Sequence, residues 1–218
     1  MTPKSTVCVG CWNVRTMYTA GKAAQVTLEM ERYRLDILGI SETRWTRAGR
    51  IKMTNCYTII FAGEESEHQR GVAMMMSQKT QKILMEWTAV SSRIISARFF
   101  SRFKKATVIQ VYALTNEATD DEKDEFYDQL QATVDKCNRH DVVIVMGELN
   151  TKVRDENKDM EEIIGKHGLG SRNDNGNRLC DFRSINGLSS QERASHTEQP
   201  TKQLGCHKTG RHEIKLIT

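Results

Sequence analysis

Short apolar runs recur along the chain, each bounded by polar or turn residues. Four of them lead directly into a polar residue and cover 7–12, 35–40, 107–111 and 142–146. Runs of this length that are rich in Val and Ile predict buried strands. Further strands are predicted at 57–62, 71–76, 83–87 and 94–99.

Helical periodicity marks the segments between these runs. The first predicted helix covers 22–34, and the second begins with Asp120 as its N-cap and extends to Cys137. Their inner positions are Ala23, Val26, Met30 and Tyr33 in the first, and Phe126, Leu130, Val134 and Cys137 in the second. A third, shorter helix starts near Asn177 and covers Leu179, Phe182 and Ile185. Strands mixed with helices predict an α/β fold with mixed sheets.

The segment from residue 188 onward has a different character. Its apolar periodicity stops, and three of the six histidines of the chain lie there. We therefore expect a globular domain over residues 1–187 and a disordered tail over residues 188–218.

Composition narrows the class of protein. The 218 residues suit one large domain, and no apolar run approaches the roughly 18 residues that a membrane span needs. The first residues carry no apolar secretion signal, and the six cysteines are spread along the chain, so free thiols in the nucleus or cytoplasm are expected, not secretion. The net charge of +4 permits a polyanionic partner without requiring one.

Polar residues that suit phosphate-ester hydrolysis follow the four leading strands. Asn13, Glu42 and Tyr112 each end or follow one strand, and Glu148 and Asn150 follow the fourth. Ligands of α/β folds tend to lie beyond the carboxyl ends of strands. A carboxylate can bind Mg²⁺ or orient water, and amide or phenol groups can contact phosphoryl oxygens. The alternative is that strands simply end in polar residues without sharing a site.

The residues themselves resemble a known family. The motifs are Cys11-Trp12-Asn13-Val14-Arg15-Thr16, Leu35-Asp36-Ile37-Leu38-Gly39-Ile40-Ser41-Glu42-Thr43-Arg44-Trp45, Val111-Tyr112-Ala113-Leu114-Thr115-Asn116 and Val145-Met146-Gly147-Glu148-Leu149-Asn150, with Asn173-Asp174-Asn175-Gly176 further on. In this order they resemble the endonuclease/exonuclease/phosphatase superfamily. The resemblance covers about residues 7–187 and is strongest to endonuclease domains of RTE-type non-LTR retrotransposons and to host proteins derived from them.

The resemblance implies a four-layer α/β sandwich and Mg²⁺-dependent nicking of DNA, with Mn²⁺ as another cation that could serve and no small-molecule cofactor or membrane partner. It implies Glu42 as the metal ligand, with Asn13 lining the metal and phosphate site. Tyr112 would lie against the phosphate, Glu148 would position or activate the water, and Asn150 would bind the scissile phosphate.

Departures from the family pattern predict a weakened enzyme. Glu148 stands where the family has Asp, and Leu114 replaces the Pro that follows Tyr-Ala. The family closes with a Trp-containing strand and with an Asp and a His that complete the site, and none of these appears in the reading frame of this chain. One alternative reading frame of 202–205 and 213–218 allows Ala-Thr-Trp and Asn-Gln-Ile-Asp-His, which predicts a frameshift near residues 188–190.

Basic residues follow the strand that leads to Glu42. Arg44, Arg47, Arg50 and Lys52 are expected in a loop that contacts DNA phosphates. The alternative is a solvated surface whose charge is balanced by Glu64, Glu65 and Glu67. For the whole chain the alternatives to an impaired endonuclease are a domesticated, non-enzymatic DNA-binding or interaction module and, more weakly, another phosphoesterase of the superfamily.

Overall fold

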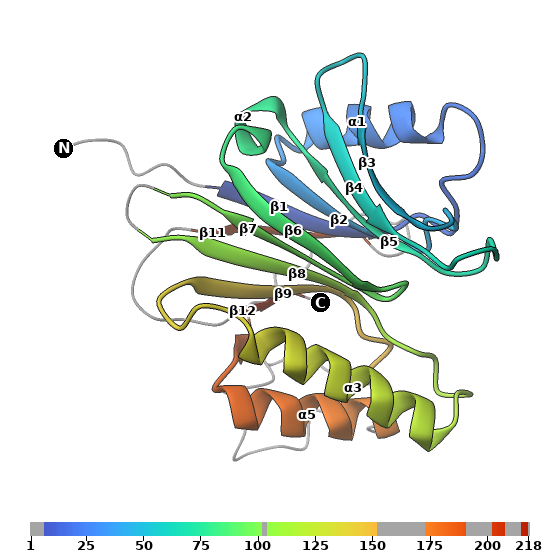
Figure 1. Ribbon diagram of the computed structural model, residues 1–218, viewed down its shortest axis with the longest axis vertical. Helices are drawn as coiled ribbons and strands as arrows, with labels where there is room; N and C mark the ends of the chain where they lie inside the picture. Colours follow the sequence, from blue (N-terminus) through green and yellow to red (C-terminus); the bar gives the residue numbers. More distant parts are fainter. Residues whose placement is uncertain (1–6, 102–103, 152–172, 191–201, 208–214, 218) are drawn as a thin grey trace.

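A computed structural model describes residues 7–101, 104–151, 173–190, 202–207 and 215–217. Within them the chain forms two six-stranded sheets that lie face to face (Figure 1). None of the helices in this part of the chain combines the length and the apolar character that crossing a bilayer requires.

The first sheet has the strand order β11-β1-β2-β5-β4-β3. Its strands are β1 (Val7–Asn13), β2 (Ile37–Ser41), β3 (Ala48–Lys52), β4 (Thr58–Ala62), β5 (Val72–Met76) and β11 (Lys202–His207). β1 and β2 are parallel, and the other neighbours are antiparallel, so the sheet is mixed. The side chains of β2 and β5 are all buried because layers cover both faces of the sheet at its centre.

The second sheet has the order β10-β12-β9-β8-β7-β6. Its strands are β6 (Leu84–Ser91), β7 (Ile94–Phe99), β8 (Ala106–Tyr112), β9 (Val142–Glu148), β10 (Ser189–Ser190) and β12 (Lys215–Ile217). β8, β9, β12 and β10 run parallel to one another, whereas β6, β7 and β8 are antiparallel neighbours. This sheet is therefore mixed as well.

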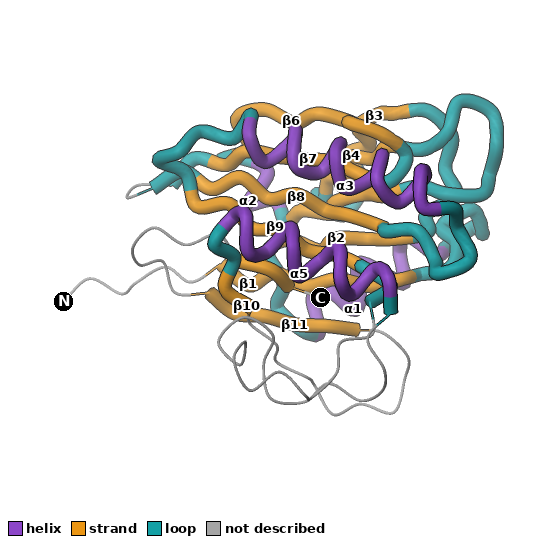
Figure 2. The backbone as a smooth tube through the Cα atoms, turned by 90° about the horizontal axis from the view of Figure 1, so that it is seen from below, coloured by secondary structure: helices purple, strands orange, loops and turns teal. Residues whose placement is uncertain are grey.

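Helices cover the outer face of each sheet (Figures 1 and 2). α1 (Lys22–Arg32) lies on the first sheet, and α3 (Asp120–Asp135) and α5 (Asp174–Asn186) lie on the second. A one-turn helix, α2 (Gln78–Gln81), follows β5. The result is the predicted four-layer α/β sandwich of two mixed sheets with helices outside.

Three apolar clusters correspond to the three contacts between layers. One fills the space between the sheets, one lies under α1, and one lies under α3 and α5. Met74 and Met76 face the space between the sheets, whereas Met75 faces α1, as alternation along a strand requires. Cys11 and Cys8 likewise face opposite sides of β1, as predicted, and both are free thiols. Cys11 is a core residue, and its burial raises the pKa of its thiol to about 12.

Several details differ from the sequence-based expectation. The N-cap of α3 is Thr119, not Asp120, because Thr119 and Glu122 form a reciprocal capping box. α5 begins at Asp174 with Asn173 as its N-cap, and Ile185, expected to be covered, is 74% exposed because it faces away from the second sheet.

Strands also form after residue 187, where the hydrophobic pattern predicted none. β11 pairs with β1 along its length, and β12 pairs with β9. A strand that adds to a sheet edge is held by backbone hydrogen bonds, so a polar sequence such as Lys202–His207 can form one. The domain boundary at residues 187 and 188 and the out-of-frame origin of the tail stay predictions.

Candidate active site

The carboxyl ends of four strands bring the predicted site residues to one edge of the sandwich. Asn13 ends β1, and Glu42 directly follows β2, which is its parallel neighbour. Tyr112 and Glu148 end β8 and β9 and are paired in register. Because β1 and β9 are in contact across the two sheets, the four side chains converge from both sheets.

Hydrogen bonds join these four side chains directly. The Asn13 amide Nδ2 donates to Glu42 Oε1 at 2.6 Å and also donates to Glu148 Oε2. The Tyr112 hydroxyl donates to the same Oε1 of Glu42 at 3.1 Å. All four residues are partly buried. The structure therefore brings Asn13, Glu42, Tyr112 and Glu148 into one cluster that spans the interface between the sheets.

The electrostatics of the cluster are those of closely placed acidic groups. Burial is the main cause that raises the pKa of Glu148; the charge of Glu42 also raises it, whereas the Asn13 hydrogen bond opposes the shift. Burial, followed by the charge of Glu42, raises the pKa of Tyr112 to about 12. No Lys or Arg within the described ranges forms an ion pair with Glu42 or Glu148.

Backbone geometry at the cluster is unusual for these residue types. Glu42 has φ 58° and Asn150 has φ 49°, both in the left-handed region. This conformation is common for Asn but costs roughly 1 kcal/mol or more for Glu. Gly147, one residue before Glu148, has φ 137°, and a Cβ there would overlap the Val111 backbone. β8 and β9 thus approach closely where the site is built.

Asn150 lies beside the cluster but bonds to a different group. Its Nδ2 donates to the Ala113 carbonyl at 2.8 Å, on the segment that follows Tyr112. Its own carbonyl accepts the Asn173 amide at 3.0 Å and the Asn175 amide at 3.5 Å. Asn175 is 1% exposed and also donates to the Leu114 carbonyl at 2.8 Å. The structure does not join Asn150 to either glutamate by a hydrogen bond.

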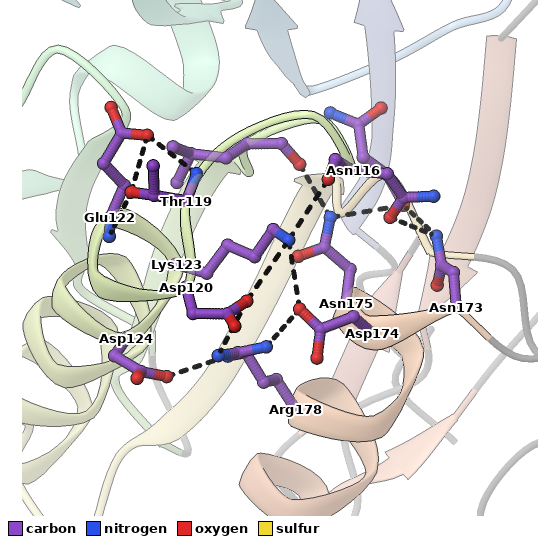
Figure 3. Close-up of polar contacts among 12 residues, drawn as sticks. Asn116, Thr119, Asp120, Glu122, Lys123, Asp124, Asn173, Asp174, Asn175 and Arg178 are labelled. Atoms are coloured by element: carbon purple, nitrogen blue, oxygen red, sulfur yellow. Dashed lines mark hydrogen bonds and ion pairs between the residues drawn. The ribbon is translucent and has the colours of Figure 1, made fainter.

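A charge network centred on the buried Lys123 supports these segments (Figure 3). Lys123 on α3 is 4% exposed, and its Nζ donates to the Asn116 carbonyl at 3.2 Å and to Asp174 Oδ2 at 3.1 Å. Arg178 on α5 pairs with Asp174 and donates to Asp124 Oδ1 on α3 at 2.8 Å. The network ties the start of α3, the start of α5 and the segment after Tyr112 together.

Sequence reasoning missed Arg93, which lies in the turn between β6 and β7. Its guanidinium carbon is 5.1 Å from the centroid of the Tyr112 ring, and its NH1 donates to the Tyr112 carbonyl at 3.1 Å. Burial lowers the pKa of Arg93, although a guanidinium remains charged at neutral pH. No sequence signal marks this role, because the contacts are to a backbone carbonyl and a ring face. Arg93 holds Tyr112 in place.

The predicted DNA-binding residues lie on the outer part of the first sheet. Arg44 and Arg47 lie between β2 and β3, as expected, but Arg50 and Lys52 belong to β3 and not to a loop. β3 was not predicted because four of its five residues are exposed and no apolar alternation marks it. All four basic residues are exposed. Among the described ion pairs Glu64 bonds to Arg70, and both the contact with DNA phosphates and the alternative of a solvated, charge-balanced surface stay predictions.

The donor set at the cluster fits a hard divalent cation. Carboxylate oxygens are the ligands that Mg²⁺ prefers, and it usually takes one or two of them together with water and phosphate oxygens. Glu42 and Glu148 are held together by one amide, which leaves their other carboxylate oxygens available as cation ligands. In the described residues no third Asp, Glu, His or Cys joins them in a cluster.

The overall fold of the chain is similar to those of several solved structures. The endonuclease domain of TRAS1, a telomere-specific non-LTR retrotransposon, matches with a TM-score of 0.58 and 12% identity, over 84% of this chain and 71% of that domain. The AP endonuclease LMAP from Leishmania major matches with a TM-score of 0.58 and 11% identity, over 84% and 68%. The 3′ phosphatase NExo from Neisseria, bound to a product DNA hairpin, matches with a TM-score of 0.57 and 17% identity, over 82% and 71%.

The chain has the endonuclease/exonuclease/phosphatase fold. The endonuclease/exonuclease/phosphatase resemblance noted in the motifs is thus confirmed at the level of the fold. At the level of sequence the chain is similar to Craniofacial development protein 2, with 37% identity over 185 residues to the proteins of Tragulus javanicus and Bos taurus. This match covers 85% of the chain but only 32% and 31% of those proteins, so the chain spans about a third of their length. No family model matches the sequence.

Proposed function

We propose that this chain is a divalent-cation-dependent phosphodiester hydrolase domain that nicks DNA and derives from a retrotransposon endonuclease. One observation carries the proposal: two glutamates, an asparagine and a tyrosine from four strand ends form one hydrogen-bonded cluster at the edge of this fold. Structural neighbours that act on DNA support the assignment of substrate, and a DNA substrate implies a nuclear or cytoplasmic site of action.

The residues of the cluster have distinct tasks in this proposal. Glu42 would hold Mg²⁺ or Mn²⁺, with the Asn13 side chain lining the metal site, and when bound, the cation supplies charge stabilisation to the phosphoryl oxygens. Glu148, with its raised pKa, takes a proton from the attacking water more readily than an ordinary glutamate. Tyr112 keeps its proton at neutral pH and donates a hydrogen bond toward the phosphate, as does the Asn13 amide. Asn150 binds a phosphate oxygen once its amide leaves the Ala113 carbonyl.

Activity is expected to be weak. Glu148 is one methylene longer than the Asp of the family, which moves the carboxylate by roughly 1 Å, and such a displacement can cost on the order of 100-fold in rate. The closing Asp and His of the family are not encoded in frame after residue 187. We also propose that residues 1–187 are the endonuclease unit and residues 188–218 a non-homologous tail.

A plasmid-nicking assay tests the function. The purified 218-residue chain is expected to relax supercoiled plasmid slowly with Mg²⁺ and not with EDTA. Glu42→Ala should abolish the activity because the cation loses a carboxylate ligand, whereas Glu65→Ala, an exposed glutamate outside the cluster, should leave it unchanged. Nicking by Glu42→Ala at the parent rate would contradict the assignment.

A non-enzymatic DNA-binding module is the second candidate. It is favoured by the small number of acidic groups at the site. Among the described residues only the carboxylates of Glu42 and Glu148 join the cluster, and both already accept hydrogen bonds from Asn13. Duplex binding that depends on salt but not on Mg²⁺, together with no nicking at any enzyme concentration, would support it.

A further inference from the structure

An exposed aromatic pair lies on the loops around the candidate site, and the hydrolysis proposed above does not use it. Tyr18 is 68% exposed, and its ring centroid lies 4.6 Å from that of His68, with an angle of 54° between the ring planes. Tyr18 follows β1 and Asn13, and His68 lies between β4 and β5. We propose that the exposed Tyr18 ring, supported by the tilted His68 ring against its side, forms a stacking platform for an unpaired nucleobase next to the phosphodiester held at Glu42.

The pair is held by hydrogen bonds between three loops. Met17 N donates to the Thr43 carbonyl at 2.9 Å, and the Trp45 indole donates to the Met17 carbonyl at 3.2 Å. These contacts fix the residue before Tyr18 against the segment that follows Glu42. A platform of this kind loses little side-chain freedom when it binds a flat ligand.

His68 is anchored to the same segment. Its Nδ1 lies 2.8 Å from the Arg44 carbonyl oxygen, and because a carbonyl can only accept, Nδ1 carries the ring proton. This contact fixes the orientation of the imidazole, although the residue itself is exposed.

The anchors place the platform near the reacting phosphate. Arg44 lies two residues after Glu42, so their Cα atoms are at most about 7 Å apart. The His68 ring contacts the Arg44 backbone directly. The next nucleotides along a strand therefore reach the platform when their phosphodiester lies at Glu42.

Charge around the platform favours a base over a run of phosphates. Arg15 and Arg44 are exposed nearby, but so are Glu65 and Glu67, which precede His68 in the same loop. Glu64 is neutralised by Arg70 at 3.2 Å. Single-strand binding combines positive charge along the backbone with aromatic faces for the bases. Because the charges here are mixed in sign, the aromatic pair is the feature that favours a base. The platform rests on the proposed function for its substrate and predicts a preference for locally unpaired DNA.

Fluorescence quenching of 2-aminopurine tests the platform without catalysis. The probes are a short single-stranded oligonucleotide with one central 2-aminopurine and the same strand in a full duplex, both at low salt with EDTA. The parent chain should quench the single strand and bind it more tightly than the duplex. Tyr18→Ala should weaken binding of the single strand roughly 5- to 150-fold, which corresponds to one lost base stack. Tyr18→Phe should keep the affinity within about twofold because its ring still stacks.

A matched control separates stacking from general aromatic exposure. Phe100 is 52% exposed and follows β7 at the end opposite to Arg93 and Tyr112, so Phe100→Ala should bind like the parent. Parent-like binding by both Tyr18→Ala and His68→Ala, or no quenching by the parent, would overturn the platform.

The same variants distinguish this inference from the proposed function. Glu42→Ala should lose nicking with Mg²⁺ but keep the quenching measured in EDTA. Quenching that depends on Tyr18 in a chain that never nicks would support the platform and refute the hydrolase. If the chain nicks DNA but its affinity for the single strand is unchanged by Tyr18→Ala and His68→Ala, the hydrolase is supported and the platform is refuted.

Discussion

The amide of Asn175 connects two segments of the candidate site, and its removal should destabilise the fold measurably. Asn175 is 1% exposed, and its Nδ2 donates to the Leu114 carbonyl at 2.8 Å and to the Asn150 carbonyl at 3.5 Å. The backbone carbonyl of Asn175 accepts a hydrogen bond from the Tyr127 hydroxyl at 3.2 Å, and this contact does not involve the Asn175 side chain. Asn175→Ala therefore removes the amide contacts and leaves the Tyr127 contact in place.

The magnitude follows from burial. A buried carbonyl that loses its donor costs about 1–3 kcal/mol, because no water replaces the amide. The small cavity left by the side chain adds about 1 kcal/mol. The expected loss of about 2–4 kcal/mol in the free energy of unfolding is large against the roughly 5–15 kcal/mol stability of a typical domain. For a chain of this size it corresponds to a fall in Tm of roughly 5–15 °C.

Urea unfolding followed by circular dichroism measures this change. Asn177→Ala is the matched control, because Asn177 is exposed on the same helix and its substitution should change stability by no more than about 0.5 kcal/mol. If Asn175→Ala unfolds at the same urea concentration as Asn177→Ala, with an unchanged slope, the amide does not hold the two segments together.

Three further outcomes are expected. Glu148→Asp should raise nicking, by up to about 100-fold, because it restores the family carboxylate position; a lower rate in the plasmid assay would count against the role given to Glu148. The pKa of Tyr112 is raised to about 12 in the folded chain, so its contribution to stability is complete below about pH 10 and is lost as the pH rises toward 12. Tyr112→Phe should therefore flatten that part of the curve of stability against pH. An unchanged curve would show that another group titrates there. Replacing residues 188–218 by an in-frame closing segment of the family should increase both solubility and nicking, as measured by yield of monomer and plasmid relaxation; a parent chain with a cooperative melt above about 60 °C and a protease-resistant tail would refute this expectation.

Strands that are buried on both faces could be predicted from the sequence. Ile94–Phe99 agrees with the expected range, β5 and β9 differ by one or two residues at one end, and β2 differs by one or two residues at each end. Their apolar side chains stabilise the strand and also mark it in the sequence. β3 has no such mark, because an edge strand with exposed side chains is held by backbone pairing to β4 alone. After residue 187, β11 and β12 are short or polar in sequence and are paired by their backbones to β1 and β9, so the hydrophobic pattern did not indicate them either.

The candidate site divides in the same way. Asn13, Glu42, Tyr112 and Glu148 could be proposed because they end strands whose direction brings them to one edge. Arg93 could not, because it acts on a carbonyl and on the face of a ring. The contacts of Asn173 and Asn175 are likewise to backbone carbonyls of segments far apart in the sequence. Side chains that act by hydrogen-bonding to backbone carbonyls cannot be identified from the sequence, because any residue can supply the carbonyl.

The pairing of β1 with β11 also has a consequence for synthesis on the ribosome. Val7 pairs with His207, so β1 can form this pairing only after a segment 200 residues further along the chain has been synthesised. At translation rates of about 5–20 residues per second, one edge of β1 remains open for roughly 10–40 s after β1 itself has been made. β2 can pair with the other edge of β1 early, but the first sheet closes on this side only when Lys202–His207 has emerged from the ribosome. The nascent chain thus carries an open strand edge at β1 until β11 has been made, and an unpaired edge of this kind is a site where another chain can pair.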